Sequence, residues 1–271
     1  MNNNYKKIVV RSIKIMVLLY GLIGCILFYA QDYFLFHPTV IERNIPYTFT
    51  VPFKEIDLPI NNTDTINMVK FLSTIAVTKG VVLYFHGNKG NINRYAKYAA
   101  NFTSKGYQVW MEDYPCFGKS IGALSEKKLY QQAEQVYLLA AASFNPDSII
   151  VYGKSFGTGI AAYVASTKKC QQLILETPYY SIPTLFNTFA PIYPTNNMAN
   201  YKIPTYQYLQ KIQQPITIFH GTADGVISYS NAIKLKDVLK PSDKFITIPQ
   251  GTHHNINTFA LYHTILDSLI Q

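Results

Sequence analysis

The chain has 271 residues, of which 48% are hydrophobic and 14% aromatic, which suits one large packed domain and excludes a disordered protein. Its formal net charge is +9, and much of that excess comes from four basic residues near the N-terminus: Lys6, Lys7, Arg11 and Lys14. The other charges are scattered rather than arranged in a stripe, so no nucleic-acid partner is predicted.

The first predicted element is an apolar segment from Ile15 to Ala30 that carries no charged side chain. With its flanks it spans roughly 16–20 residues, close to the length of a helix that crosses a bilayer core. Because basic residues precede it, we expect residues 1–31 to be a signal-anchor whose N-terminus lies in the cytoplasm. The rest of this single-pass protein would then lie on the extracytoplasmic side of the membrane.

Two alternatives to the anchor stay open, a cleaved signal peptide and a lipoprotein signal. The second is suggested by Leu22–Cys25, which reads LIGC and fits a small-residue-then-cysteine processing site. After Cys25 the chain stays apolar through ILFYAQDYFLF, where a mature lipoprotein usually becomes polar. This continuation favours the anchor.

Beyond Pro38 the chain alternates strand-like and helix-like segments. Residues 53–59 and 65–73 alternate apolar and polar positions, which is typical of half-exposed antiparallel edge strands. Short apolar runs bounded by Gly, Pro or Asp then indicate strands covered on both faces: GVVLYFHG, YQVWMEDY, SIIVYG, LILETP, PITIFHG and KFITIP. Residues 125–143 have helical spacing behind a Ser125 cap. The pattern predicts an α/β fold with a mostly parallel central sheet and helices on both faces.

Ser155 lies between two glycines in VYGKSFGTG, at the turn from a buried strand to a helix rich in small residues. A turn this sharp needs glycine at positions 153 and 157, and it exposes the hydroxyl of the serine between them. The motif indicates a nucleophilic serine. The alternative is a glycine-rich turn with a serine cap.

A nucleophilic serine needs a base to take its proton and a carboxylate to orient that base. Asp224 in GTADG and His253 in GTHHN both follow strands, and the carboxyl ends of parallel strands meet at one edge of a sheet. The order serine, aspartate, histidine fits a triad on such a sheet. Glu176 after LILE is the other candidate acid, and His254 the other candidate base.

An acyl-transfer site also needs two N–H donors for the developing oxyanion. We predict the backbone amides of Phe156, after the serine, and of Asn88, in the loop HGNKGN; a plain flexible turn is the alternative for that loop. The other histidines are given lesser roles: His86 bracing its loop, His220 supporting the site, and His37 and His263 at the surface or in packing.

Together, the segments YFHGNKGNI, DYPCFGKS, VYGKSFGTGIAAY, LILETPYYS, PITIFHGTADGVIS and IPQGTHHNI closely resemble the α/β-hydrolase superfamily. In particular, they resemble the membrane-anchored bud-emergence-type serine hydrolases, which are α/β-hydrolase-domain-containing proteins with an N-terminal transmembrane segment. The resemblance runs from about Tyr29 to the C-terminus. It implies an α/β-hydrolase fold over residues 32–271, with a short cap insert at about 178–210.

The resemblance also implies a role for each candidate residue. Ser155 would be the nucleophile, Asp224 the acid and His253 the base, with the oxyanion hole formed by the amides of Asn88 and Phe156. The sequence departs from the family pattern in two places outside this set, with Ser228 where proline is usual and His254 where asparagine is usual.

The implied activity is hydrolysis of a carboxylic ester or thioester through an acyl-enzyme intermediate. The aromatic, proline-rich insert is expected to place an apolar wall over the site, which favours an acyl or aromatic group over a sugar or phosphate; an ordinary packing excursion is the alternative. The expected substrate is then a small-molecule, lipid or acylated-protein ester. The cysteines show no C-x-x-C spacing, and we predict no metal, disulfide or cofactor. The competing class is a non-catalytic, membrane-tethered scaffold with the same fold.

Overall fold

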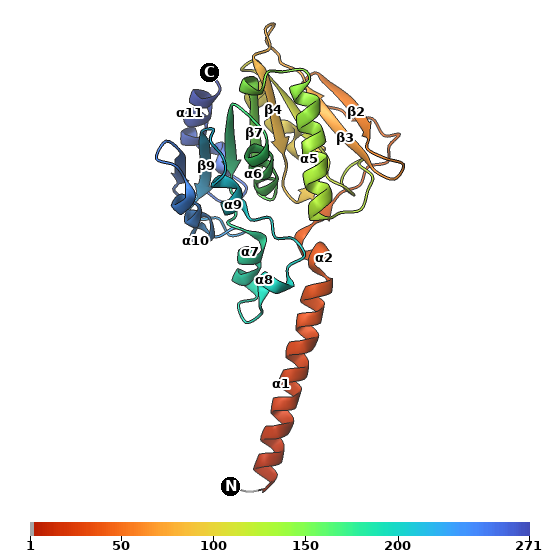
Figure 1. The fold of residues 1–271 in the computed structure, drawn as a ribbon, viewed down its shortest axis with the longest axis vertical. Coiled ribbons are helices and arrows are strands. Elements are labelled where there is room, and N and C mark those ends of the chain that lie inside the picture. The colour runs from red at the N-terminus through yellow and green to blue at the C-terminus, as the bar shows by residue number, and fades with distance from the viewer. Residues whose placement is uncertain (1–2) are drawn as a thin grey trace.

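A long N-terminal helix projects from an α/β domain (Figure 1). The structure is a computed structural model that describes residues 3–271, so the first two residues of the predicted anchor lie outside it. Helix α1 (Asn3–Tyr29) is followed directly by α2 (Gln31–Leu35).

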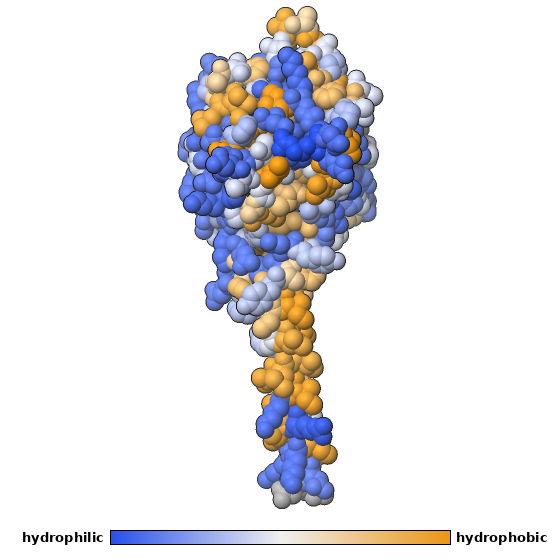
Figure 2. Space-filling model, turned by 90° about the vertical axis from the view of Figure 1, so that its right-hand side faces the viewer, coloured by the Kyte–Doolittle hydropathy of each residue, from blue (hydrophilic) through white to orange (hydrophobic). Residues whose placement is uncertain are grey.

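The side chains of α1 are exposed along most of its length, with an apolar upper part and a hydrophilic N-terminal end (Figure 2). Residues Asn4–Tyr29 contain a stretch of mean hydropathy 2.0, long and apolar enough to cross a membrane. A signal sequence near an N-terminus has the same length and composition, so these features fit the anchor and its two alternatives alike.

Eight strands form the central sheet, in the order β10-β9-β8-β7-β4-β6-β3-β2. Their bounds are β2 (Phe53–Pro59), β3 (Thr65–Phe71), β4 (Gly80–Phe85), β6 (Tyr107–Glu112), β7 (Ile149–Lys154), β8 (Gln172–Glu176), β9 (Ile216–Gly221) and β10 (Lys244–Ile248). Strand β3 pairs antiparallel with β2 and β6, and the pairs from β6 to β10 are parallel. The predicted, mostly parallel sheet is confirmed.

Strand β3 differs from the prediction because it is buried along most of its length. It lies between β2 and β6 rather than at the edge, and Phe49 packs on its Phe71. A second, two-stranded sheet pairs β1 (His37–Pro38) with β5 (Lys89–Gly90).

Two hydrophobic clusters cover the two faces of the sheet. One lies under α5 (Glu126–Ala141) and α6 (Gly157–Thr167). The other lies under α3 (Ile92–Tyr95), η1 (Ala96–Tyr98), α4 (Ala100–Thr103) and α11 (Ala260–Leu269). The predicted Ser125 cap of α5 is confirmed, because its side chain accepts a hydrogen bond from the Lys128 amide. The remaining short helices are η2 (Pro146–Ser148), α10 (Tyr229–Ala232), η3 (Ile233–Val238) and η4 (Ile256–Thr258).

The segment between β8 and β9 forms α7 (Ile182–Phe189), α8 (Thr195–Met198) and α9 (Thr205–Leu209). Helices α7 and α8 lie beside the upper end of α1 and α2 (Figure 1). The side-chain amide of Gln31 in α2 donates to the Met198 carbonyl at 2.8 Å. We call residues 178–210 the cap, and it is attached to the N-terminal helices as well as to the sheet.

Candidate active site

Ser155 sits at the turn between β7 and α6 in a left-handed backbone conformation, with φ of 52°. A Cβ added at Gly157 would lie 2.1 Å from the Phe85 carbonyl oxygen, and one at Gly153 would lie 2.6 Å from the Gly157 carbonyl oxygen. Only glycine fits this close approach of strand and helix. The contact holds Ser155 above the end of the sheet.

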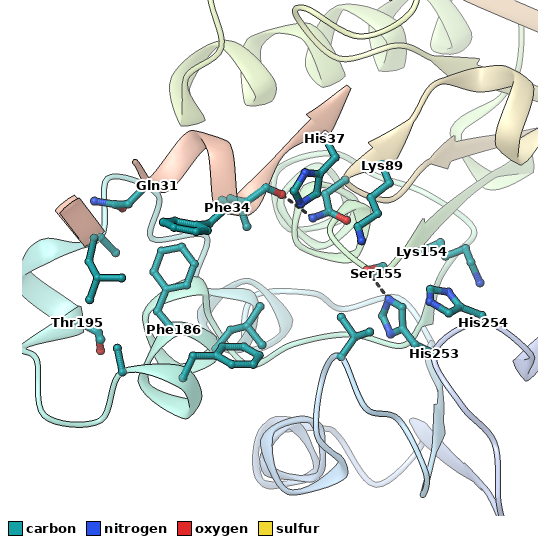
Figure 3. Close-up of a pocket in the computed structure, with 18 of the residues that line it drawn as sticks. Gln31, Phe34, His37, Lys89, Lys154, Ser155, Phe186, Thr195, His253 and His254 are labelled. Carbon is teal, nitrogen blue, oxygen red and sulfur yellow. Dashed lines mark hydrogen bonds between the residues drawn. The ribbon is translucent and has the colours of Figure 1, made fainter. Parts of the chain in front are cut away.

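The structure brings Ser155, His253 and Asp224 into one hydrogen-bonded chain. The Nε2 atom of His253 lies 2.8 Å from Ser155 Oγ (Figure 3), and its Nδ1 lies 2.8 Å from Asp224 Oδ2. With Nδ1–H donating to the carboxylate, Nε2 is left to accept the serine proton. This is the geometry that a serine nucleophile and its base require.

The carboxylate of Asp224 is held as an anion. Burial alone would raise its pKa, but hydrogen bonds from His253 and from the amides of Ile227 and Val226 outweigh burial and lower it. Next to it, His220 is fully buried, and its Nε2 lies 3.0 Å from the Ile227 carbonyl. Burial lowers the pKa of His220, which favours a neutral ring that supports the Asp224 loop.

Glu176 and His254, the alternative acid and base, do not join this hydrogen-bonded arrangement. Glu176 is buried and accepts hydrogen bonds from Lys154 and Tyr152, so its carboxylate is engaged away from His253. His254 packs its ring 5.2 Å from that of His253, but within residues 3–271 it makes no hydrogen bond to Ser155 or Asp224.

The two predicted oxyanion donors come from either side of Ser155. Phe156 precedes the first turn of α6, and Asn88 follows Gly87, where an added Cβ would lie 3.5 Å from Ser155 Cβ. Across the described part of the chain, neither of these backbone amides donates to a protein acceptor. Both N–H groups are therefore available to a ligand.

The loop that carries Asn88 is held from several directions. The Asn88 carbonyl accepts from the His37 amide at 2.9 Å, and its side chain donates to the Leu35 carbonyl. His86 is fully buried, with Nδ1 2.7 Å from the Gly87 carbonyl and Nε2 3.4 Å from Asp113 Oδ1. These contacts fit the predicted bracing role of His86.

A cavity of about 770 Å³ surrounds Ser155. Its walls include residues that the sequence reasoning did not assign, among them Leu27 and Gln31 from the N-terminal helices. His37 also lines the cavity, which differs from the predicted surface or packing role. The pairing of β1 with β5 brings this residue to the site. His263 lies outside the cavity, exposed, with Nε2 2.8 Å from the Asn257 carbonyl.

The described residues hold no cluster of His, Cys, Asp or Glu suited to a metal ion. Cys25 and Cys116 are exposed and Cys170 is buried, and all three are free thiols.

The sequence of this chain is similar to one protein family and to several known proteins. The sequence profile of the family described as "Serine aminopeptidase, S33" matches residues 76–211. Alpha/beta hydrolase domain-containing protein 17C of Xenopus tropicalis is 26% identical over 194 residues, which cover 70% of this chain and 61% of that protein. The human protein of the same name is 24% identical over 205 residues, covering 74% and 61%. The chain thus spans about three-fifths of the length of these relatives.

Solved structures share the fold at low sequence identity. An esterase from Pyrococcus furiosus superposes with a TM-score of 0.67 at 15% identity, covering 87% of this chain and 96% of the esterase. The esterase domain of a Rhodothermus marinus protein gives 0.61 at 14% identity, covering 80% and 97%.

Proposed function

The chain belongs to the α/β-hydrolase superfamily, in the family described as serine aminopeptidase S33, and from this premise we propose that it hydrolyses carboxylic esters or thioesters. The observation that carries the proposal is the hydrogen-bonded arrangement of Ser155, His253 and Asp224, with both hydrogen bonds at 2.8 Å. The compared structures named as esterases agree with an ester as the substrate bond.

In the proposed reaction, Ser155 Oγ attacks the carbonyl carbon while its proton passes to His253 Nε2. The amides of Asn88 and Phe156 donate to the oxyanion, and the Asp224 carboxylate stabilises the imidazolium. The bond from the carbonyl carbon to the leaving oxygen or sulfur then breaks, and the leaving group takes the proton from His253. Water attacks the acyl-enzyme with His253 as base, which releases the acid and restores Ser155.

The cavity supports an acyl substrate, lipid-like or attached to a protein. Apolar side chains of the cap, Phe186 and Leu185, line it together with Leu27 and Phe34 of α1 and α2. An acyl chain in this position would bury its methylene groups against an apolar wall.

We also propose a membrane-bound arrangement. Residues 1–31 would be the anchor, with a cytoplasmic N-terminus, and residues 32–271 an extracytoplasmic hydrolase domain that includes the cap. The apolar surface of α1 and the basic residues at its N-terminal end support this orientation (Figure 2).

A fluorophosphonate probe tests the function, because it reacts with an activated serine. We expect the purified full chain to be labelled, and Ser155→Ala to remove the label while the fold is retained by circular dichroism. Absence of labelling on folded wild-type protein would instead favour the non-catalytic scaffold.

A further inference from the structure

The cavity around Ser155 has two chemically different ends. Phe34 and Phe186 lie on one side of Ser155, whereas Lys154 and His254 lie on the other (Figure 3). Lys89 extends from β5 toward Ser155. The apolar end lies between the N-terminal helices and the cap, and the basic end lies against the loops after β4 and β7.

Helices α3 and η1 add two more cations to the basic end. Arg94 and Lys97 line the cavity, and their neighbour Tyr98 has its ring centre 5.2 Å from Lys154 Nζ. The cavity lining therefore contains four Lys or Arg side chains and, within the described residues, no Asp or Glu.

Three of these four cations lack a protein counterion. In residues 3–271, Lys89, Arg94 and Lys97 make no ion pair, and only Lys154 is paired, with the buried Glu176. The positive potential also affects a neighbour: the pKa of His254 is lowered first by burial and then by His253, Lys154 and Arg94. Unpaired like charges that converge on one cavity favour an anionic ligand.

We propose that the substrate is an anionic amphiphile, an acyl ester whose leaving alcohol carries a phosphate group. This assignment rests on the proposed ester hydrolysis. The acyl chain occupies the apolar end, and the phosphate binds Lys89, Arg94 and Lys97 on the other side of Ser155. Three unpaired cations match a phosphate dianion better than a single carboxylate, and guanidinium binds phosphate in a bidentate manner.

The phosphate is bound and not cleaved. The carbonyl carbon–oxygen bond breaks at Ser155, the phosphorylated alcohol leaves with the proton from His253 Nε2, and water then releases the fatty acid. Discrimination should therefore appear between esters that differ only in the phosphate.

A matched pair of substrates tests this on the full chain in uncharged detergent: 1-octanoylglycerol 3-phosphate and 1-octanoylglycerol. We expect kcat/KM to be about tenfold or more higher for the phosphate ester, since charge-assisted hydrogen bonds are among the stronger ones. The preference should weaken as NaCl is raised to about 0.5 M, because exposed charges are screened.

The double variant Arg94→Gln, Lys97→Gln should lower that kcat/KM ratio by about fivefold or more. The double variant Lys127→Gln, Lys211→Gln is the matched control, because it also removes two charges, and both lysines are exposed, lie outside the cavity and form no ion pair within residues 3–271; its ratio should stay at the wild-type value. An equal fall in the ratio for this control would mean that only overall charge matters and would overturn the site.

Binding separates this proposal from the catalytic one. Calorimetry on Ser155→Ala should show about tenfold tighter binding of 1-octanoylglycerol 3-phosphate than of 1-octanoylglycerol. Equal affinities would overturn the anionic site even if Ser155-dependent ester hydrolysis is found. If inorganic phosphate binds as tightly as 1-octanoylglycerol 3-phosphate, the acyl chain contributes nothing to binding, and the proposal of an amphiphilic substrate would be overturned. Absence of Ser155-dependent hydrolysis would refute the proposed function, and tighter binding of the phosphate ester would still support the site.

Discussion

Tyr193 of the cap stacks on Tyr20 of α1, with ring centroids 4.5 Å apart and ring planes 7° from parallel. The Tyr20 hydroxyl donates to the Ile192 carbonyl and the Tyr193 hydroxyl to the Tyr20 carbonyl, each at 3.0 Å. Tyr20 lies within the uncharged part of α1, so the tip of the cap reaches alongside the apolar helix. At that tip Phe189 and Ile192 are 71% and 70% exposed. Exposed apolar residues beside an apolar helix favour contact with lipid at this end of the cavity.

Substitution of the three proposed catalytic residues should remove activity without unfolding the protein. Ser155→Ala, His253→Ala and Asp224→Asn are each expected to lower kcat on a p-nitrophenyl ester by about three to six orders of magnitude, because the members of a catalytic triad act as a unit. His263→Ala is the control, since this exposed histidine lies outside the cavity. The base is wrongly assigned if His254→Ala is inactive and His253→Ala is not.

Alanine at Phe186 or Phe189 should change the preference for acyl-chain length. Both side chains line the cavity, and each methylene buried against such a wall contributes about 0.8 kcal/mol, roughly a fourfold effect on kcat/KM. We expect a larger loss with octanoyl and palmitoyl esters than with acetyl esters, measured as kcat/KM across the series. Phe144 lies outside the cavity, so Phe144→Ala should leave the ratios of kcat/KM between the esters of the series unchanged. An equal proportional loss at every chain length in the cap variants would limit the cap to a structural role.

Gly157→Ala should strongly destabilise the fold. The added methyl would lie 2.1 Å from the Phe85 carbonyl oxygen, so strand β4 and helix α6 would have to separate, at a cost of about 3 kcal/mol or more. Gly225→Ala adds the same methyl where no atom lies within 4 Å, and it should change the melting temperature little. Similar melting temperatures for the two variants would contradict the close strand–helix contact.

Glu112 should make stability fall with rising pH. Burial raises its pKa to about 8, with Gln132 opposing and Asp113 adding to the effect, and neither carboxylate oxygen has a well-aligned hydrogen-bond partner in the described chain. A carboxyl group whose pKa is raised on folding contributes its full stabilisation of the folded state below 4.5, the pKa in the unfolded chain. That contribution is lost as the pH rises through about 8, the pKa in the folded protein.

Glu112→Gln should therefore gain stability over the wild type as pH rises, by about 1.4 kcal/mol per pH unit at most between the two pKa values. Denaturant unfolding at about pH 5 and pH 9 measures the difference, which should be small at the lower pH. Glu42→Gln, at an exposed glutamate, is the control. A gain of equal size at both pH values would rule out ionisation of Glu112 as its cause.

Cysteine labelling tests the membrane orientation. Cys116 is exposed on the α/β domain, so a membrane-impermeant maleimide should label it in intact cells, and Cys116→Ser should remove that label. Labelling only after lysis would place the domain in the cytoplasm. Recovery of a protein that begins at an acylated Cys25 would replace the anchor by a lipoprotein signal.

The features predicted from sequence are those with a local cause. Alternating and continuous apolar runs predicted the parallel sheet, and the fold and superfamily are confirmed. Gly153 and Gly157 report a local steric demand, so the turn at Ser155 was visible in nine consecutive residues. The structure brings Ser155, Asp224 and His253 together as expected, while their catalytic roles stay predictions.

The walls of the cavity had no comparable local signal. Leu27 and Gln31 reach it because α1 and α2 pack against the cap, which comes more than a hundred residues later in the chain. The pairing of Lys89 with His37 is likewise a long-range contact of two-residue strands. Such contacts depend on tertiary packing, and the periodicity of apolar residues along the sequence does not report it.

The junction of α1 and α2 contains no flexible linker between the N-terminal helix and the α/β domain. Helix α1 ends at Tyr29 and α2 begins at Gln31, so only Ala30 separates the two helices, and both contribute to the wall of the cavity, α1 through Leu27 and α2 through Gln31. With α1 in a bilayer, as proposed, Ser155 would lie at a fixed height above the lipid rather than at the end of a flexible tether. A hydrolase held in this way would select its targets by distance from the membrane as well as by chemistry: ester bonds near the lipid surface would be within reach, and those carried far from it would not.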